Sequence, residues 1–250
     1  MKICKSLQAF AIACFMMLGA TTHAQDKELT VAMDTAFVPF GFKQDGKYVG
    51  FDIDLWAAIA QDMNVKYRIQ VMDFVGIIPA LQTYNVDVAL AGMTIKPERA
   101  KVIDFSDPYY ASGTAIMVRA GEQSIRSAAD LNGKIVGAKT GTATADWIKA
   151  NLKPKELRLF QKIDDAYLDL RAGGVDAAMH DTPNVEYYVK TAGDGAVKIA
   201  EERKTGAVYG IAFPKGSALV VRVNASLQKI KANGTYAQIY RKWFGTEPRL

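Results

Sequence analysis

The sequence predicts an α/β fold made of two similarly built lobes. Short apolar, β-rich runs alternate with helical patterns along the chain, which is typical of helices packed on a mostly parallel sheet. The order of elements also begins twice, because "ALQTYNVDVALAGMT" and "DLRAGGVDAAMHDT" share one pattern of helix, turn, Val-Asp, strand and polar end. Half of the 250 residues are hydrophobic and 23% are charged, a composition that excludes disordered and fibrous proteins.

The first copy of this pattern begins with a strand from Leu29 to Met33. From Phe51 to Met63 apolar residues recur at every fourth position, as on one face of an amphipathic helix. The remaining elements expected before the repeat are a helix over 75–82, a strand over 86–91 and a short helix over 94–101.

The second copy begins at residue 135, and two helices close the chain. Its expected elements are a strand over 135–138, helices over 144–151 and 164–171, and a strand over 175–179. An apolar, β-like stretch over 209–213 then leads to helices over 220–230 and 236–243. If these helices return to the first lobe, the chain crosses between the lobes twice, and two crossings form a hinge and a cleft.

Residues 1–24 have the pattern of a secretory signal peptide. Lys2 and Lys5 precede an apolar stretch from Leu7 to Ala20, and small residues before Gln25 suit a cleavage site. The apolar stretch is shorter than the roughly 18 residues of a membrane-spanning helix. We therefore expect an exported protein in the periplasm.

Removal of this segment would take both cysteines with it and leave His180 as the single histidine. The exported chain then has no disulfide, so its hydrophobic core must stabilise it unaided. It has no thiol nucleophile and no cysteine-based metal site, and we expect neither a metal nor a cofactor. The formal charge of +5 falls by two, and no basic run interleaved with aromatics occurs, so nucleic acid is not an expected partner.

Polar residues follow each of the four predicted strands, at the sheet edge where open α/β sheets bind ligands. These positions and the aromatics near them are Asp34 and Phe37 after the first strand, Phe74, Gly92, Thr94 and Arg99 around the second, Lys139 to Ala143 after the third, and His180 and Asp181 after the fourth.

Each of these residues also has a structural interpretation. Asp34 could cap a turn, Lys139 could point into water, and Arg99 could lie on a solvated helix face. Asp181 could be the N-cap of a helix that begins at Pro183, and the phenylalanines could belong to the core. The functional interpretation rests on their convergence at one edge of two lobes.

Together these groups suit an amino-acid zwitterion. Arg99 and the backbone N–H groups of 141–143 would bind its carboxylate, and Asp181, the Gly92 carbonyl and the Thr94 hydroxyl would accept from its ammonium. Phe37 and Phe74 would cover an aliphatic stem.

Asp34 and Lys139 then face the side chain of the ligand as one acceptor and one donor, which match a carboxamide. A charged side chain would instead meet a like charge, at a cost of roughly 2–5 kcal/mol. Glutamine fits best.

Longer segments of the chain carry a family resemblance. The segments "DTAFVPFGFKQDGKYVGFDIDLWAAIA", "MDFVGIIPALQTYNVDVALAGMTIKPERAKVIDFSDPYY", "HDTPN" and "NGTYAQIYRKWFGTEP" are similar to the polar amino-acid-binding proteins of bacterial ABC importers. Phe51-Asp52-Ile53-Asp54-Leu55 and Ser106-Asp107-Pro108-Tyr109-Tyr110 suit the wider family, and Lys139 with His180-Asp181 suits its glutamine-binding members.

The resemblance implies the two-lobed fold of type II periplasmic binding proteins, in which each lobe is a mixed sheet flanked by helices and two hinge strands join the lobes. Lobe 1 would comprise 25–108 and 210–250, lobe 2 would comprise 114–204, and hinges would lie at 109–113 and 205–209. It implies ligand contacts at Asp34, Phe37, Phe74, Gly92, Thr94, Arg99, Lys139, His180 and Asp181. Ala143 stands where this family has glycine, and the backbone N–H contact expected there should survive the exchange.

The leading hypothesis is a monomeric, non-enzymatic binding protein that captures L-glutamine and delivers it to the membrane permease of an ABC importer. A dehydratase-like enzyme on the same fold is the alternative, because Lys139, His180 and Asp181 could exchange protons. No nucleophile elbow, P-loop or dinucleotide motif supports that alternative. The sensor module of a receptor is a third hypothesis, which the absence of a second membrane segment makes less favourable.

Overall fold

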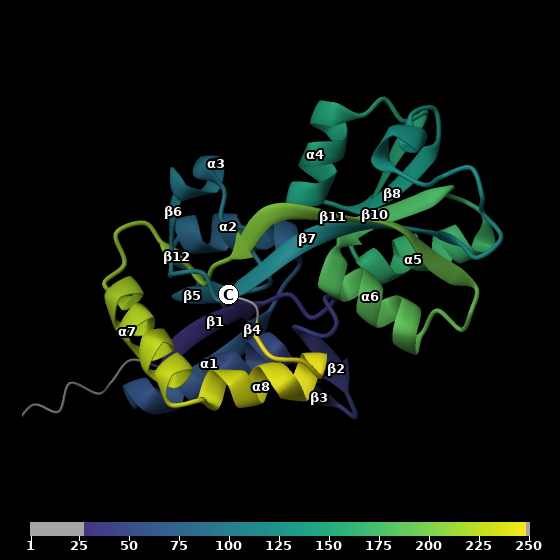
Figure 1. The fold of residues 1–250 in the computed structure, drawn as a ribbon. Helices are drawn as coiled ribbons and strands as arrows, with labels where there is room; N and C mark the ends of the chain where they lie inside the picture. Colours follow the sequence, from purple (N-terminus) through teal and green to yellow (C-terminus); the bar gives the residue numbers. More distant parts are fainter. Residues whose placement is uncertain (1–27, 249–250) are drawn as a thin grey trace, which may run out of the picture.

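The computed structural model describes residues 28–248 and has two α/β lobes (Figure 1). Each lobe is a five-stranded mixed sheet flanked by helices, so the predicted fold class is confirmed. The predicted signal peptide over 1–24 lies outside the described residues. Within the described range, no helix combines the length and hydropathy needed to cross a membrane.

The first lobe contains both chain ends of the described range. Its sheet has the order β4-β1-β5-β12-β6, with β1 parallel to β4 and β5, and β12 antiparallel to its neighbours. The strands are β1 (Leu29–Met33), β4 (Tyr67–Val71), β5 (Val88–Leu90), β6 (Ile103–Phe105) and β12 (Ala212–Pro214), and the hairpin β2 (Phe42–Gln44) with β3 (Lys47–Val49) lies beside them. The helices are α1 (Phe51–Met63), α2 (Phe74–Gln82), α3 (Pro97–Ala100), α7 (Leu219–Ala232) and α8 (Thr235–Phe244).

The second lobe is formed by the middle of the chain. Its sheet has the order β11-β7-β10-β8-β9. The strands are β7 (Tyr110–Arg119), β8 (Ile135–Lys139), β9 (Glu156–Phe160), β10 (Ala177–Asp181) and β11 (Val197–Tyr209). The helices are α4 (Ala143–Asn151), α5 (Ile163–Ala172) and α6 (Thr182–Thr191), with a short 3-10 helix at Ala128–Leu131.

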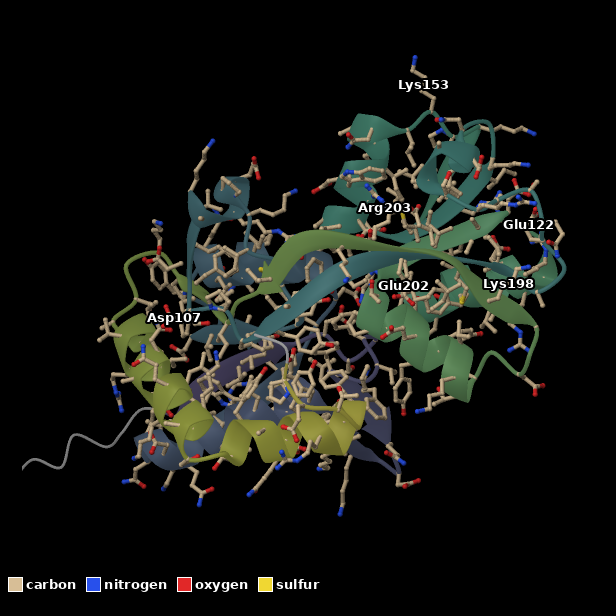
Figure 2. The ribbon with its side chains drawn as sticks, in the orientation of Figure 1. Asp107, Glu122, Lys153, Lys198, Glu202 and Arg203 are labelled. Carbon is tan, nitrogen blue, oxygen red and sulfur yellow. The ribbon has the colours of Figure 1, made fainter. Side chains whose placement is uncertain are left out.

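The two lobes are joined by β7 and β11, which run side by side from one lobe into the other (Figure 1). They pair antiparallel from Tyr209 with Tyr110 onward, and the register shifts between Arg203 and Ala207. Glu202 and Arg203 point to opposite sides of this ribbon (Figure 2), as successive strand residues do. The predicted hinge ranges fall on this ribbon, and their role as hinges stays a prediction.

An aromatic cluster anchors the base of this ribbon in the first lobe. Tyr110 stacks on Tyr209 at 5.5 Å between ring centroids, and Phe40 contacts both rings edge-on at 4.9 and 5.5 Å. Phe51 of α1 and Tyr240 of α8 contact Tyr110 from the other side. Aromatic pairs of this kind add about 0.5–1.5 kcal/mol each beyond the area that they bury, so the start of the ribbon is held in place.

Two predicted elements differ from the structure near the cleft. The helix expected over 94–101 shrinks to one turn, α3, because Ile95 donates its N–H to the Val208 carbonyl at 2.9 Å and Pro97 begins the helix. The strand expected over 175–179 lies two residues later, because β10 pairs with β7 as far as Asp181 with Thr114. As a result, His180 and Asp181 belong to the strand itself.

Candidate functional site

One cavity between the lobes brings together all ten residues that the sequence places in a ligand site. Side chains fill most of it, and the remaining free volume is about 10 Å³, roughly what one water molecule needs. Its lining comprises Asp34, Phe37, Phe74, Gly92, Thr94, Arg99, Lys139, Ala143, His180 and Asp181, together with Ala91 and Thr142. Their contact with a ligand stays a prediction.

Asp34 and Lys139 contact each other directly across the cleft. The Lys139 ammonium forms an ion pair with Asp34 Oδ2 and donates to the Ala36 carbonyl at 3.1 Å, and both charged side chains are at most 5% exposed. Asp34 Oδ1 also accepts from the Ala36 N–H at 2.9 Å, so this carboxylate both shapes a turn and faces the cavity. The interpretation of Lys139 as a residue pointing into water is wrong.

This pair still offers hydrogen-bonding capacity to the cavity. An ammonium has three donors, and in the described chain Lys139 uses two of them. Asp34 retains acceptor lone pairs, since a carboxylate has about four. Asp164 at the start of α5 is close enough for its pKa, which burial raises, to be lowered by Lys139 and raised by Asp34.

Arg99 is buried between the lobes rather than solvated. Its guanidinium donates to the Thr94 carbonyl at 2.9 Å and to the Gly141 carbonyl of the opposite lobe at 3.1 Å. It lies 5.4 Å from the centre of the Phe74 ring. Burial lowers its pKa, an effect that Asp146 and Asp181 oppose, but an arginine stays protonated in proteins. Three of its five N–H donors are left for a carboxylate.

The N-terminus of α4 opens onto the same end of the cavity. Thr142 is its N-cap: the hydroxyl accepts from the Ala145 N–H at 3.2 Å and donates to the Lys139 carbonyl at 2.8 Å. The N–H groups at the start of a helix have no partner within the helix. Those of Ala143 and Thr144 are therefore suited to an anion, which places a second carboxylate-binding group beside Arg99.

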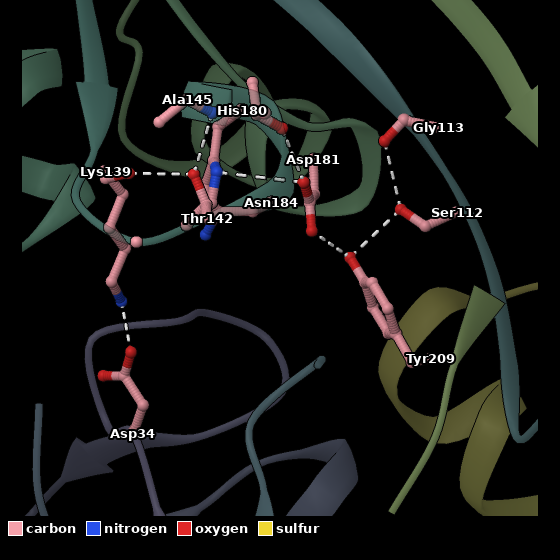
Figure 3. Close-up of polar contacts among 12 residues, drawn as sticks. Asp34, Ser112, Gly113, Lys139, Thr142, Ala145, His180, Asp181, Asn184 and Tyr209 are labelled. Atoms are coloured by element: carbon pink, nitrogen blue, oxygen red, sulfur yellow. Dashed lines mark hydrogen bonds and ion pairs between the residues drawn. The ribbon is translucent and has the colours of Figure 1, made fainter. Parts of the chain in front are cut away.

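Asp181 occupies the N-cap position of α6, but its side chain does not cap the helix. Its Oδ1 accepts from the Thr144 hydroxyl at 3.1 Å, and its Oδ2 accepts from the Tyr209 hydroxyl at 2.5 Å (Figure 3). The Tyr209 hydroxyl also lies 3.0 Å from Ser112 Oγ. These contacts, which sequence reasoning missed, hold the carboxylate against the cavity and leave lone pairs for a cation.

His180 is a neutral, unpaired ring in the wall of the cavity. It is 2% exposed and packs against the Phe37 ring at 5.5 Å. Burial lowers its pKa to about 4, although Asp181, at 3.9 Å from Nδ1, acts in the opposite direction. Neither ring nitrogen has a hydrogen-bond partner within the described chain. A neutral imidazole therefore presents one donor and one acceptor.

Gly92 lies beneath the Phe37 ring in the left-handed region of backbone space, with φ of +54°. A Cβ at this position would lie 2.2 Å from Phe37 Cε1, so only glycine fits. Its N–H donates to Asp52 Oδ2 at 3.1 Å, a contact that sequence reasoning also missed. Phe37 in turn stacks on Phe40 at 4.8 Å, and so it belongs to both the core and the cavity wall.

Two lobes joined by two strands, with a charge-lined cavity between them, define a binding protein for a small polar solute. The chain belongs to family 3 of the bacterial extracellular solute-binding proteins, whose family model matches residues 29–246.

Relatives of this family bind more than one amino acid. The L-arginine-binding protein of Pseudomonas aeruginosa strain PAO1 is 33% identical, over 96% of each chain. A solved structure described as an ancestral arginine-binding protein bound to arginine is 45% identical, with a TM-score of 0.83 over 87% of this chain and 98% of that one. A second, described as the ancestral protein bound to glutamine, is likewise 45% identical, with a TM-score of 0.83 over 88% and 98%.

Proposed function

We propose that this protein captures L-glutamine between its two lobes and delivers it to the membrane permease of an ABC importer. The observation that carries the substrate assignment is the Asp34–Lys139 ion pair at the side-chain end of the cavity. The pair has no net charge, yet it keeps one donor and acceptor lone pairs. A carboxamide matches this pair, because its N–H₂ can donate to Asp34 while its oxygen accepts from Lys139.

The opposite end of the cavity suits the backbone of any L-amino acid. Arg99 and the N-terminus of α4 supply donors for the carboxylate, and Asp181 supplies an acceptor for the ammonium. The charges of Arg99 and Asp181 also balance each other. Arg99 and Asp34 belong to the first lobe, whereas Lys139 and Asp181 belong to the second. A ligand that contacts both lobes favours the closed form through differential affinity.

Arginine is the main competitor, because relatives that bind it share this fold. Its guanidinium would meet the Lys139 ammonium in a buried site, or would have to displace it from Asp34. Like charges in a water-excluded pocket cost several kcal/mol. Glutamate would face Asp34 in the same way. The charge of Lys139 therefore supports a ligand with a neutral side chain, although relatives in the family include both arginine-binding and glutamine-binding proteins.

Contacts that link the lobes around the cavity support closure on a ligand. They include the Lys139–Asp34 and Lys96–Asp146 ion pairs and the hydrogen bonds from Lys139 to Ala36, from Arg99 to Gly141 and from Asn184 to Val38. We propose that the protein works in the periplasm as a monomer, as its family and its predicted signal peptide suggest.

The state of the ionisable groups supports the proposal of a binding role rather than a catalytic one. Lys139 and Asp181 already have partners, and the pKa of His180, lowered to about 4, leaves it neutral at the pH where a general acid would act.

Thermal unfolding with single amino acids tests the assignment. Glutamine at 100 times its Kd should stabilise the protein by about 2.7 kcal/mol, which raises Tm by roughly 5–10 °C for a domain pair of this size. Asparagine, glutamate, histidine, lysine and arginine at the same concentration should raise it less. A larger rise with arginine or lysine would contradict the proposal, and turnover of a small carboxylic acid would favour the dehydratase alternative.

A further inference from the structure

The motif Phe51-Asp52-Ile53-Asp54-Leu55 contains two carboxylates with different surroundings. Asp54 is partly exposed and joins α1 to α8: its Oδ2 accepts from the Trp243 indole N–H at 2.7 Å and from the Lys242 ammonium at 2.6 Å. Asp52 is 1% exposed and has no cation among its contacts in the described residues. The contacts between α1 and α8 thus account for Asp54, whereas no such contact between helices accounts for the buried carboxyl of Asp52.

Asp52 lies directly behind the ligand cavity. Its Oδ2 accepts from the Gly92 N–H at 3.1 Å. Its Oδ1 has no hydrogen-bond partner in the described chain, although the buried Tyr109 hydroxyl faces the carboxyl and Tyr236 is near enough to interact with it. Burial raises the pKa of Asp52 to about 7, and the contacts with Tyr109 and Gly92 oppose that rise.

The Gly92 contact matters because this buried residue has an unusual backbone conformation. Its φ of +54° is one that side chains avoid, and the Phe37 ring covers it from the cavity side. Asp52 accepts from the N–H of the Ala91–Gly92 peptide, and holding this peptide restricts the directions that the Gly92 carbonyl, on the next peptide, can take. A carboxylate binds such an N–H about twice as strongly as a neutral group does.

Tyr109 extends the same network to the other lobe. Its N–H donates to the Tyr209 carbonyl at 2.9 Å, and the Tyr209 hydroxyl holds Asp181. Tyr109 thus links Asp52, behind Gly92 of the first lobe, to the strand whose Tyr209 contacts Asp181 of the second lobe. Tyr109 immediately precedes β7 and Tyr209 ends β11, where the chain passes between the lobes.

We propose that Asp52 is a positioning residue that fixes Gly92 for the ligand ammonium and strengthens ligand binding when it is ionised. The inference rests on the proposed amino-acid site. The ionised carboxylate improves the bond to Gly92 and adds negative potential behind the ammonium position. By linkage, a bound ammonium lowers the pKa of Asp52, so binding near neutral pH releases a proton.

Calorimetry between pH 5.5 and 8.5 tests this coupling. Wild-type affinity for glutamine should rise about three- to tenfold between pH 6 and 8, and titrations at pH 7 in phosphate and in Tris should reveal proton release. Asp52→Asn keeps an oxygen that accepts from Gly92 but cannot ionise, so its affinity should be lower at pH 8, its pH profile flat and its proton release absent. Asp54→Asn, the matched control on α1, should keep the wild-type profile.

The outcomes separate this inference from the proposed function. If wild-type protein binds glutamine with no proton release and no pH dependence, or if Asp52→Asn keeps both, Asp52 does not act as proposed. If wild-type protein binds no amino acid at all, the function itself is wrong. If the variant does not fold, the absence of proton release and of pH dependence in the wild-type protein still contradicts the inference.

The pH dependence of protein stability tests independently whether the Asp52 carboxyl ionises near neutral pH. The folded pKa of about 7 lies above the unfolded value of 3.8, so the folded state keeps a proton that the unfolded state has lost, and stability falls as pH rises from about 4 to 7. Asp52→Asn should show a smaller fall, because only the contribution of Asp164, whose pKa burial also raises, remains, and it should unfold at a higher temperature than wild type at pH 8. An unchanged fall in the variant would contradict the burial of an ionising Asp52.

Discussion

Replacement of Asp181 with alanine or asparagine should weaken binding of every L-amino acid by about 100-fold or more. The carboxylate is 8% exposed and is held by Thr144 and Tyr209. Its removal leaves a buried ammonium without its counter-charge, a change that costs about 2–5 kcal/mol. Because the ammonium is common to all amino acids, the loss should be similar for glutamine and asparagine. Titration calorimetry of both ligands measures it.

Asp181→Asn is the more informative of the two variants. Its side-chain oxygen can still accept from the Tyr209 hydroxyl, so the fold should be retained while the charge is lost. Asp165→Asn, which removes an exposed carboxylate from the same lobe, should leave affinity unchanged. Full affinity in Asp181→Asn would mean that Asp181 has only the structural role of preceding α6.

Replacement of Lys139 should change which amino acid is preferred. Lys139→Ala and the longer Lys139→Met both remove the cation that neutralises Asp34. Glutamine should bind at least tenfold more weakly, because it loses a donor and meets an unpaired buried carboxylate. Arginine and lysine should lose far less or gain affinity, since they can pair with Asp34. The ratio of Kd for arginine to Kd for glutamine should therefore fall at least tenfold.

Lys96 supplies the matched control for this ratio. It also forms an ion pair across the cleft, with Asp146 at 2.9 Å, but at the exposed mouth. Lys96→Met should change the affinity for all ligands by a similar small factor and leave the ratio intact. An unchanged ratio in both Lys139 variants would contradict the proposal that Lys139 and Asp34 select a ligand with a carboxamide side chain.

Hydrophobic patterns predicted the elements that bury apolar residues. The fully buried strand at Leu29–Met33 and the helix at Phe51–Met63 have the bounds expected, because a largely apolar run marks the strand and a four-residue repeat marks the helix. Of β7 and β11, the longest strands among the described residues, only the hinge strands near 109–113 and 205–209 were predicted, from the family resemblance. Residues 201–205 of β11 are charged or polar and largely exposed, so no apolar alternation reveals a strand whose pairing partner lies about 90 residues away.

The site was reached through the rule that ligands lie at the carboxyl ends of strands. This rule brings Asp34, Lys139 and Asp181 to one edge, as in the structure. It could not foresee that Asp34 and Lys139 pair directly, since that distance depends on how far the lobes close. Tyr209 and Asp52 were missed for a related reason. Each acts through a contact with a segment far away in the sequence, and the residues next to it in the sequence do not indicate that contact.

The central claim is that the cavity is built for an amino acid with a neutral carboxamide side chain. It is tested most directly by titration calorimetry of wild-type protein, unfolded and refolded to remove any bound solute, with glutamine and then with arginine. The balanced Asp34–Lys139 pair predicts that glutamine binds at least tenfold more tightly. Tighter binding of arginine would contradict it and would assign Lys139 a role in closing the cleft rather than in choosing the ligand.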